Sequence, residues 1–312
     1  MDVVELHERT VSGFVEHVDR VDPTSWSRAT PCTGWSVRAL VHHLVSEDRW
    51  TRPLLEGRTI EEVGSALEGD LLGADPAAAA RSAADEATTA VRSLLHEGAT
   101  VGLSYGEESA EEYVRQLSAD HLVHAWDLCA ATGQSFAPEA ALVTEVAGWF
   151  VDRESLYRAA GIIAERPPAP TVRREQVDGD LDALLVAMGR DPGWSPNHVL
   201  LQEFSEAWGR CDLNAIMALV SDDVVFETTG PAPDGERHTG VDAVRALWDV
   251  MFAVTNDPAF HAESSFVTGD RGVIQWRYSW RGDDGEPGHV RGVDLLRFAD
   301  GKVVEKLSYA KG

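Results

Sequence analysis

Two segments with helical patterns carry residues that could hold a metal ion. His43 lies in GWSVRALVHHLV, and Asp120 and His124 lie in RQLSADHLVHAWDL. Asp120 and His124 are four residues apart, so a helix would place them one turn apart on the same face. A buried carboxylate and a buried imidazole are costly unless they are paired, hydrogen-bonded or bound to a cation. With His43 as a third donor, the set would form a divalent site with open coordination positions, which is typical of a catalytic metal.

These residues can also be interpreted without a metal. A carboxylate and a histidine four residues apart are common on helices, so Asp120 and His124 could be a hydrogen-bonded pair in a core, with His43 an unrelated surface residue. Tyr113 and Leu117 continue the stripe that holds Asp120 and His124, so this stripe is predicted to be the buried side of its helix. The spacing alone leaves both interpretations open.

Other residues beside the candidate ligands have structural interpretations. A neighbour on a helix is turned by about 100°, so His42 and His121 are predicted to support the ligands or to lie at the rim of the site. His42 is also a less favoured alternative to His43 as a ligand. Trp35 is predicted to pack at the start of its helix, and Asp127 to cap or to support the site.

The composition argues against several classes of partner. The net charge is −25, and the only lysines, Lys302, Lys306 and Lys311, lie near the end of the chain. No basic stripe could neutralise phosphates, so nucleic acids and anionic membranes are not expected as partners. No run of eighteen apolar residues occurs, and the opening segment MDVVELHERT is acidic, so neither a membrane span nor an export signal is expected. A cytoplasmic location is therefore predicted.

The three cysteines, Cys32, Cys129 and Cys211, are far apart and form no CxxC motif. They are not expected to form a disulfide framework or a sulfur-rich zinc site. Each is interpreted as a small residue of the core or its rim.

Helical patterns fill roughly the first 164 residues. One helix precedes VDPTSW, the second follows PCTGW with Ser36 as its N-cap, a third covers 76–97, the fourth ends near Gly133, and another covers 138–160. The fourth helix carries the candidate ligands that are four residues apart. Four helices without a strand signal predict a bundle, in which metal sites form between facing helices.

The domain boundary is predicted within Pro192–Asn197. The segment ERPPAPTVRREQVDGD is predicted to be irregular, because it has three prolines and little apolar content. The helix-like LDALLVAMGRDPGW that follows has enough apolar residues to pack on the bundle. The first domain is therefore predicted to cover 1–194 and the second 197–312.

The second half changes to an α+β pattern. An amphipathic helix with a break at Cys211 and Asp212 is followed by the β-rich runs VVFETT, FHAESSFVT, RGVIQWRYSWRG, HVRGVDLLRF and KVVEKLSYA. The turn sequences ADGK and RGDDGEPG predict antiparallel neighbours. Helices followed by strands predict an α+β layout with helices on one face of a curved antiparallel sheet.

The first half resembles the mycothiol-dependent maleylpyruvate isomerase family and its DinB-like metal-binding relatives. PCTGWSVRALVHHLV and YVRQLSADHLVHAWDLCAATG carry the resemblance, with support from LLGADPAAAA and GRDPGW. It implies an all-α DinB-like four-helix bundle with a divalent metal held by His43, Asp120 and His124. The isomerase has glutamate at the position of Asp120, so this chain keeps the carboxylate on a side chain one methylene shorter.

The second half, from residue 198 to 312, resembles SnoaL-like and ketosteroid-isomerase-like members of the nuclear transport factor 2 (NTF2) fold. The matching stretches are FSEAWGRCDLNAIMALVSDDVVFE, HTGVDAVRALWDVMF and HVRGVDLLRFADGKVVEKLSYAKG. The resemblance implies a conical pocket, which the family uses for enzymes and for inert binding alike. The whole chain is thus predicted to be a multidomain protein, a bundle followed by an NTF2-like cone.

Ketosteroid isomerase chemistry is not expected in this cone. Phe204 stands where that enzyme has a tyrosine donor, and Thr228 stands where it has its base, and neither side chain can do the required work. Asp294 remains at the position of the oxyanion-hole aspartate and is the candidate catalytic residue. The competing interpretation is a structural salt bridge with Arg291 or Arg277.

The predicted function is that of a divalent-metal-dependent enzyme, a mycothiol-using isomerase or thiol transferase acting on a small molecule. Zinc is the preferred metal, and nickel, iron or manganese suit the same donors. In the isomerase that the bundle resembles, the thiol of mycothiol adds to a conjugated double bond, and rotation and elimination give the trans isomer. The second fold commonly dimerises, so a homodimer is expected.

Two other functions stay open. The protein could bind a metal and a small molecule without turnover, because groups needed for catalysis are missing from the cone. Alternatively, the second domain could be a SnoaL-like cyclase or hydrolase that uses Asp294, with the bundle as scaffold. Alanine at His124 would abolish activity only under the metal-dependent function, and alanine at Asp294 only under the cone-based one.

Overall fold

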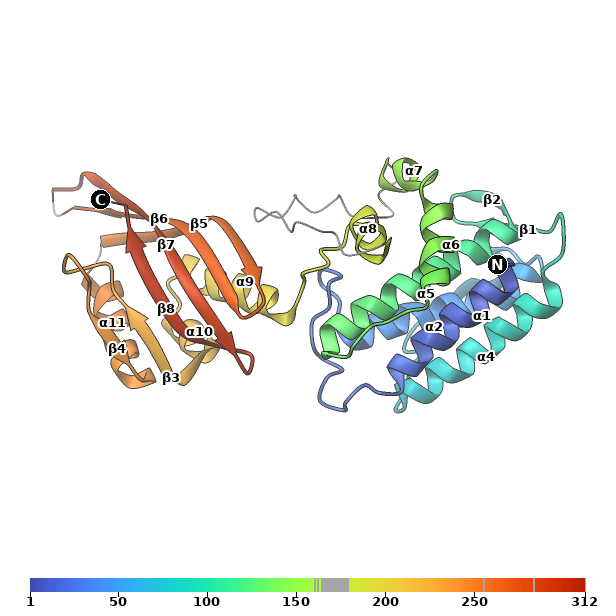
Figure 1. Cartoon of the computed structure of the whole chain (residues 1–312), viewed down its shortest axis with the longest axis horizontal. Coiled ribbons are helices and arrows are strands. Elements are labelled where there is room, and N and C mark those ends of the chain that lie inside the picture. The colour runs from blue at the N-terminus through green and yellow to red at the C-terminus, as the bar shows by residue number, and fades with distance from the viewer. Residues whose placement is uncertain (160, 162, 164–179, 255, 283, 312) are drawn as a thin grey trace. The chain divides into compact units, whose positions relative to one another are not determined.

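The computed structural model describes residues 1–159, 161, 163, 180–254, 256–282 and 284–311 and divides into two compact units, Met1–Pro192 and Gly193–Gly312 (Figure 1). The segment ERPPAPTVRREQVDGD, predicted to be irregular, lies outside the described residues except for Asp180. Among the helices of the described ranges, none is both long and apolar enough to cross a bilayer.

Four helices of the first unit lie alongside one another as a bundle: α1 (Val3–Val18), α2 (Val37–Leu55), α4 (Pro76–Leu94) and α5 (Ala110–Thr132). Each begins where a short polar side chain accepts a hydrogen bond from a backbone N–H of its first turn; these are Asp2, Ser36, Asp75 and Ser109. The chain leaves α5 at Gly133, whose left-handed φ of 74° suits glycine. The predicted caps at Ser36 and Gly133 are confirmed.

The remaining elements of the first unit are α3 (Ile60–Val63), the 3₁₀ turn η1 (Gly64–Leu67), β1 (Thr100–Leu103), β2 (Gly106–Ser109), α6 (Ala140–Phe150), α7 (Glu154–Ala159) and α8 (Asp180–Ala187). The prediction of no strand was wrong, because β1 and β2 pair as an antiparallel hairpin of four residues each. Strands so short show little alternation in the sequence. The helix predicted over 138–160 is two helices, α6 and α7.

α5 is the central helix of the bundle. The sequence predicted one buried stripe, but every residue from His121 to Cys129 is buried. The reason is that α5 packs against α1, α2 and α6 on different sides. Polar residues on α5 therefore enter the interior in several directions, and Asp120 is among its half-buried positions.

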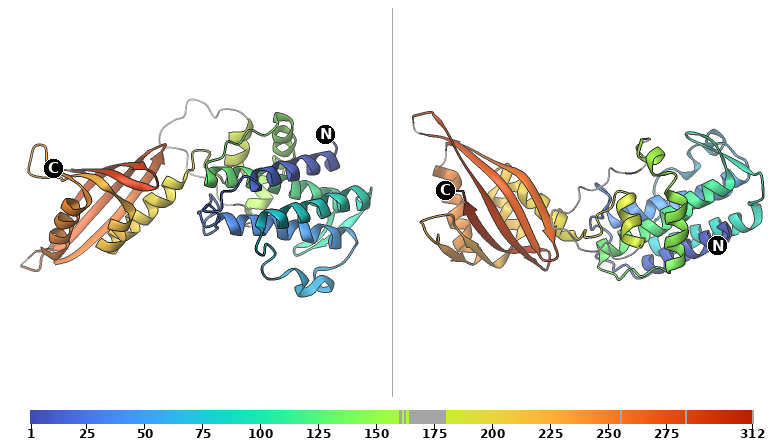
Figure 2. Two further views of the ribbon diagram at one scale, coloured as in Figure 1. Left: turned by 90° about the horizontal axis from the view of Figure 1, so that it is seen from below. Right: turned by 45° about the horizontal axis from the view of Figure 1, so that its top comes forward.

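The second unit is a six-stranded sheet with helices on one face (Figure 2). Its strands are β3 (Val220–Glu227), β4 (Arg237–Thr239), β5 (Asn256–Thr268), β6 (Arg271–Arg281), β7 (Pro287–Ala299) and β8 (Lys302–Ala310), in the spatial order β4-β3-β8-β7-β6-β5. Its helices are α9 (Pro196–Gly209), α10 (Leu213–Leu219) and α11 (Val241–Val254). All neighbouring strands are antiparallel except β3 and β8, which run parallel. The predicted break between α9 and α10 is confirmed, with Cys211 at φ 51°.

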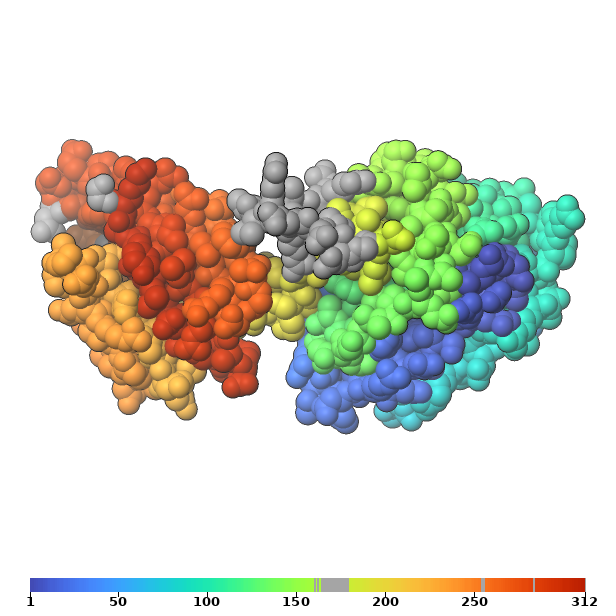
Figure 3. Space-filling model, viewed as in Figure 1, coloured from blue at the N-terminus to red at the C-terminus, as the bar shows by residue number. Residues whose placement is uncertain are grey.

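The two faces of this sheet differ in what covers them. The helix-covered face holds an aromatic core that includes Phe204, Trp208 and Trp248. No described helix of the second unit lies on the opposite face, where Figure 3 shows the orange and red atoms of the late strands at the surface. Exposed apolar side chains there include Leu295 and Tyr309.

Candidate metal centre

The three predicted ligands come together between α2 and α5. His43 Nε2 lies 2.9 Å from Asp120 Oδ2, and His124 Nε2 lies 3.3 Å from Asp120 Oδ1. One donor atom from each of the three residues lies within 4.8 Å of the others. The shorter side chain of Asp120, compared with the glutamate of the isomerase, still reaches both imidazoles. Two imidazoles and a carboxylate form a donor set that suits zinc and several other divalent ions.

The second ring nitrogen of His124 is held by a carboxylate. Asp127 Oδ2 accepts from His124 Nδ1 at 2.8 Å, and the guanidinium of Arg190 donates to the same oxygen at 2.9 Å. This arrangement fixes the ring and leaves Nε2 facing Asp120, which is how a carboxylate typically orients a metal-binding histidine. The predicted supporting role of Asp127 agrees with these contacts.

Charge coupling inside the site is strong. Burial raises the pKa of Asp120, but the neighbouring His124 and His43 outweigh it and hold that pKa well below its usual range. Burial lowers the pKa of His124, but Asp120 and then Asp127 outweigh it and hold that pKa well above its usual value. Asp120 is therefore ionised and ready to bind a cation, and His124 carries a proton that a metal would displace.

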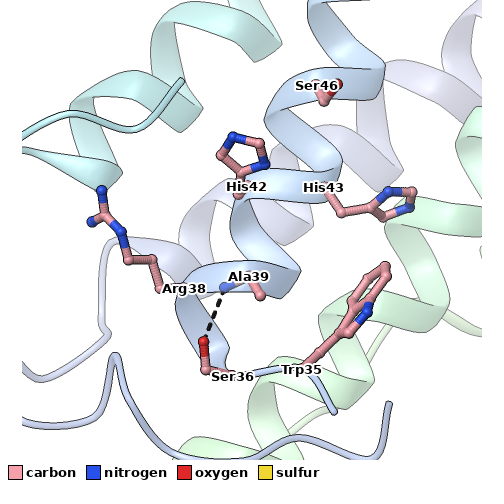
Figure 4. A pocket seen from close by; sticks show the side chains of 7 residues that line it. All are labelled: Trp35, Ser36, Arg38, Ala39, His42, His43 and Ser46. Carbon is pink, nitrogen blue, oxygen red and sulfur yellow. Dashed lines mark hydrogen bonds between the residues drawn. The ribbon is translucent and has the colours of Figure 1, made fainter. Parts of the chain in front are cut away.

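Adjacent histidines on α2 point in different directions. Figure 4 shows His43 turned to the same side as Trp35 and His42 turned away from it. The ring of Trp35 lies 5.0 Å from that of His43 and is stacked 5.9 Å from that of His124. His42 Nε2 instead contacts the carbonyl oxygen of Gly69 at 2.8 Å. The alternative of His42 as a ligand was wrong, since a one-residue step on a helix turns the side chain out of the site.

His121 is also turned away from the three ligands, but it is not at a rim. It is fully buried, its Nδ1–H donates to the carbonyl of Leu117 at 2.8 Å, and its Nε2 lies 3.3 Å from Asp48 Oδ1. The prediction of a rim position was wrong because the centrality of α5 buries the side of the helix that was expected to be exposed. His121 and Asp48 form a separate polar pair in the bundle core.

A cavity of about 1580 Å³ opens beside the three ligands. It follows α5 from Ser109 to His124, and an α-helix of that length spans roughly 22 Å. Its walls near the ligands include Glu47 and Arg190, and its far end includes Arg153. Burial raises the pKa of Glu47, and the charge of Asp120 raises it further.

Sequence reasoning missed Cys32, Glu47 and Arg190. Cys32 Sγ donates to Asp127 Oδ2 at 3.3 Å and lies 3.9 Å from His124 Nδ1, so this cysteine borders the site rather than the general core. The guanidinium of Arg190 lies 3.5 Å from Cys32 Sγ and supplies a positive charge beside Cys32 and Asp127. The only available signal was the position of Cys32 in PCTGW and of Arg190 in GRDPGW, two motifs that were given no role in the site.

The candidate residues of the cone are arranged differently from the expectation. Asp294 is buried and lies 2.8 Å from the ammonium of Lys306, so its cationic partner is a lysine, and the arginine partners considered for it were wrong. Arg291 instead pairs with Glu263. Phe204 is packed in the core, and the Thr228 hydroxyl donates to the carbonyl of Gly230. No described contact restores a base at either position.

Fold and site together define a bundle with a candidate metal centre, followed by an NTF2-like unit. Residues 8–129 match the family described as the mycothiol maleylpyruvate isomerase N-terminal domain, and residues 201–306 match the SnoaL-like domain. Uncharacterized proteins from two strains of Mycobacterium tuberculosis are each 32% identical to this chain over 139 residues, covering 43% of it and 70% of the relative. The chain belongs to the mycothiol maleylpyruvate isomerase N-terminal domain family and carries a SnoaL-like domain as its second unit.

Solved structures similar to the chain include NTF2-like proteins of unknown function. One from Mesorhizobium loti is 39% identical, covers 37% of this chain and 90% of its own, and has a TM-score of 0.33. Another, from Burkholderia pseudomallei, is 22% identical, covers 38% of this chain and 92% of its own, and has a TM-score of 0.34.

Proposed function

We propose that the first unit is a divalent-metal-dependent isomerase or thiol transferase that uses mycothiol on a small molecule. The observation that carries the proposal is the convergence of His43, Asp120 and His124 within 4.8 Å at the wall of the cavity. A divalent cation, when bound, lowers the pKa of a coordinating thiol and so supplies a strong nucleophile near neutral pH. Zinc is the preferred metal, and nickel, iron and manganese are the alternatives.

The residues around the ligands suit this function. Asp127 holds His124 so that Nε2 is directed at Asp120 and the metal position, while Arg190 balances the charge of Asp127. Trp35 packs against both imidazoles and so helps to hold their rings in place. Glu47, whose pKa burial raises, is placed to hold a proton in the cavity wall.

The size of the cavity supports a reaction between two molecules. Pockets for one drug-sized ligand occupy roughly 300–1,000 Å³, whereas this cavity has a volume of about 1580 Å³. It therefore has room for a thiol cofactor and a second substrate side by side. Cys32 borders the site but is engaged with Asp127, so the reacting thiol is proposed to come from the cofactor.

The test is an assay of thiol-dependent isomerisation of maleylpyruvate with the zinc-loaded full chain and mycothiol. We expect turnover that requires both metal and thiol and that falls by about 10² or more in Asp120→Asn, which keeps the shape but removes the charge. Asp294→Asn is the matched control in the second unit and should keep full turnover. If activity needs Asp294 but not Asp120, the catalytic site lies in the second unit. If the chain binds metal but shows no thiol-dependent turnover, it is a binding protein.

We also propose that the chain forms a homodimer through the uncovered face of the second sheet. Phe266, Leu295 and Tyr309 are exposed there, and the strand register places them on the same face. Analytical ultracentrifugation should give twice the chain mass of 34.0 kDa for the wild type and 34.0 kDa for Leu295→Asp. Val250→Asp, at an exposed apolar residue of α11, is the control and should stay dimeric. A wild type that sediments only as a single chain would refute the dimer.

A further inference from the structure

A buried lysine on the helix-covered face of the second sheet has no part in the metal chemistry. Lys306 Nζ lies 2.8 Å from Asp294 Oδ2 and donates to Ser308 Oγ at 2.6 Å. Ser308 in turn donates to Asp294 Oδ1 at 2.7 Å. Lys306 and Asp294 are only 4% and 1% exposed. These contacts form a closed polar triad inside an aromatic core.

The register of β7 and β8 places this triad on the helix-covered face of the sheet. Asp294 is opposite Ser308, and Leu296 is opposite Lys306, so all four side chains point toward the helices. The ammonium lies 5.0 Å from the centre of the Trp208 ring. Burial lowers the pKa of Lys306, and Asp294 opposes this shift without cancelling it. The amine is therefore easier to deprotonate than that of an exposed lysine.

Three buried indoles of the same aromatic core have N–H groups without an acceptor among the described residues, and one of them, Trp208, lies against Lys306. Trp208, Trp248 and Trp276 are each at least nine-tenths buried, and within the described ranges none of their Nε1 atoms has a hydrogen-bond partner. Their rings are linked by contact, with Trp208 5.2 Å from Trp248 and Phe260 between Trp208 and Trp276. Buried donors are nearly always satisfied in folded proteins. This group of free donors among apolar rings suits a ligand that is mostly apolar and carries an oxygen acceptor.

We propose that Lys306 is a nucleophilic amine that forms an imine with an apolar aldehyde or ketone held against these tryptophans. Asp294 accepts a proton from the ammonium, and the free amine attacks the carbonyl carbon. The resulting carbinolamine loses its hydroxyl group with a proton as one molecule of water, which leaves a carbon–nitrogen double bond to Lys306. Desolvation of a lysine in an apolar pocket is a known way to activate it as a nucleophile, and no further reactant is required.

A purely structural interpretation makes a different prediction. A buried ion pair can often be replaced by apolar residues without loss of stability, so its presence in this core is weak evidence for a stabilising role. A structural pair would be unreactive toward carbonyl compounds in the folded protein. The reactivity of the Lys306 amine toward carbonyl compounds in the folded protein therefore distinguishes the two interpretations.

The experiment is reductive trapping on the folded full chain with 2-naphthaldehyde and sodium cyanoborohydride, followed by peptide mass mapping. The chain offers its own comparison, because Lys302 and Lys311 are its only other lysines and both are exposed. We expect Lys306 to gain the mass of the aldehyde less one oxygen atom at least about tenfold faster than either. Asp294→Asn should slow labelling of Lys306 alone, and Lys302→Arg should leave it unchanged.

The opposite pattern would overturn the proposal. If Lys302 and Lys311 are labelled in the folded chain while Lys306 reacts only after unfolding in urea, the triad is structural. This comparison needs only the wild type, so it does not depend on whether a variant folds. It is also independent of metal content, because neither Lys306 nor its contacts include a residue of the first unit.

Discussion

Replacing His124 by alanine is expected to abolish divalent-metal binding by the first unit. The wild type should hold about one ion per chain, and the variant should lose affinity by more than the 10- to 100-fold that removal of a merely supporting residue typically costs. His124 is the most buried of the three ligands, and it is shared between Asp120 on one ring nitrogen and Asp127 on the other. Its loss removes a donor and also leaves two carboxylates without their common partner.

Metal content by inductively coupled plasma mass spectrometry on untagged protein is the measurement. His42→Ala is the matched control, because it removes the same side chain from α2 one residue away from His43, where the ring contacts Gly69 and not the site. Circular dichroism of both variants separates loss of the site from loss of the fold. A wild type that takes up no ion after incubation with zinc or nickel would refute the metal centre. An equal loss in His42→Ala would refute the assignment of His43.

Replacing His7 by leucine is expected to stabilise the first unit, and to stabilise it more at acid pH. His7 lies on α1, is fully buried, and neither ring nitrogen has a hydrogen-bond partner within the described residues. Burial, and then the neighbouring His121, lowers the pKa of His7 from 6.5 to about 3. The imidazole therefore stays neutral in the folded chain at pH values where it is protonated in the unfolded chain.

The direction of the pH effect follows from this difference. Between pH 6.5 and 3 the unfolded chain binds a proton at His7 that the folded chain does not, so stability falls as the pH falls through this range. At 1.36 kcal/mol for each pKa unit, the penalty at pH 5 is about 2 kcal/mol. His7→Leu removes it, and it also removes two unpartnered polar atoms at any pH, a gain of about 1 kcal/mol or more.

Hydrogen exchange of α1 and α5 amides measures this stability for the first unit alone. The gain in His7→Leu should be larger at pH 5 than at pH 7.5, and the difference between the two pH values is the decisive quantity. His17→Leu is the matched control on the same helix, since His17 is half-buried and its ring contacts Gln134. A destabilised His7→Leu, or a gain that does not change with pH, would show that His7 has a partner or a proton in the folded chain.

The sequence by itself determined the features that depend on near neighbours. Ser36 was predicted correctly as the start of α2 and Gly133 as the end of α5, because capping is a contact between residues a few positions apart. Asp120 and His124 were paired because the helical repeat alone brings them together. Strand alternation could even have excluded Arg291 as a partner of Asp294, since residues three apart on one strand point to opposite faces.

The tertiary structure alone decided which distant residues meet. His43 reaches Asp120 from 77 residues away, and Arg190 reaches Asp127 from 63, through helix packing that no local pattern encodes. The pairing of Lys306 with Asp294 depends on the register of β7 and β8, because a shift by one residue would send one of them to the other face. The burial of His121 and His7 could not be predicted from the sequence either. How many sides of a helix are buried depends on how many neighbours pack against it, and not on the pattern of the helix itself.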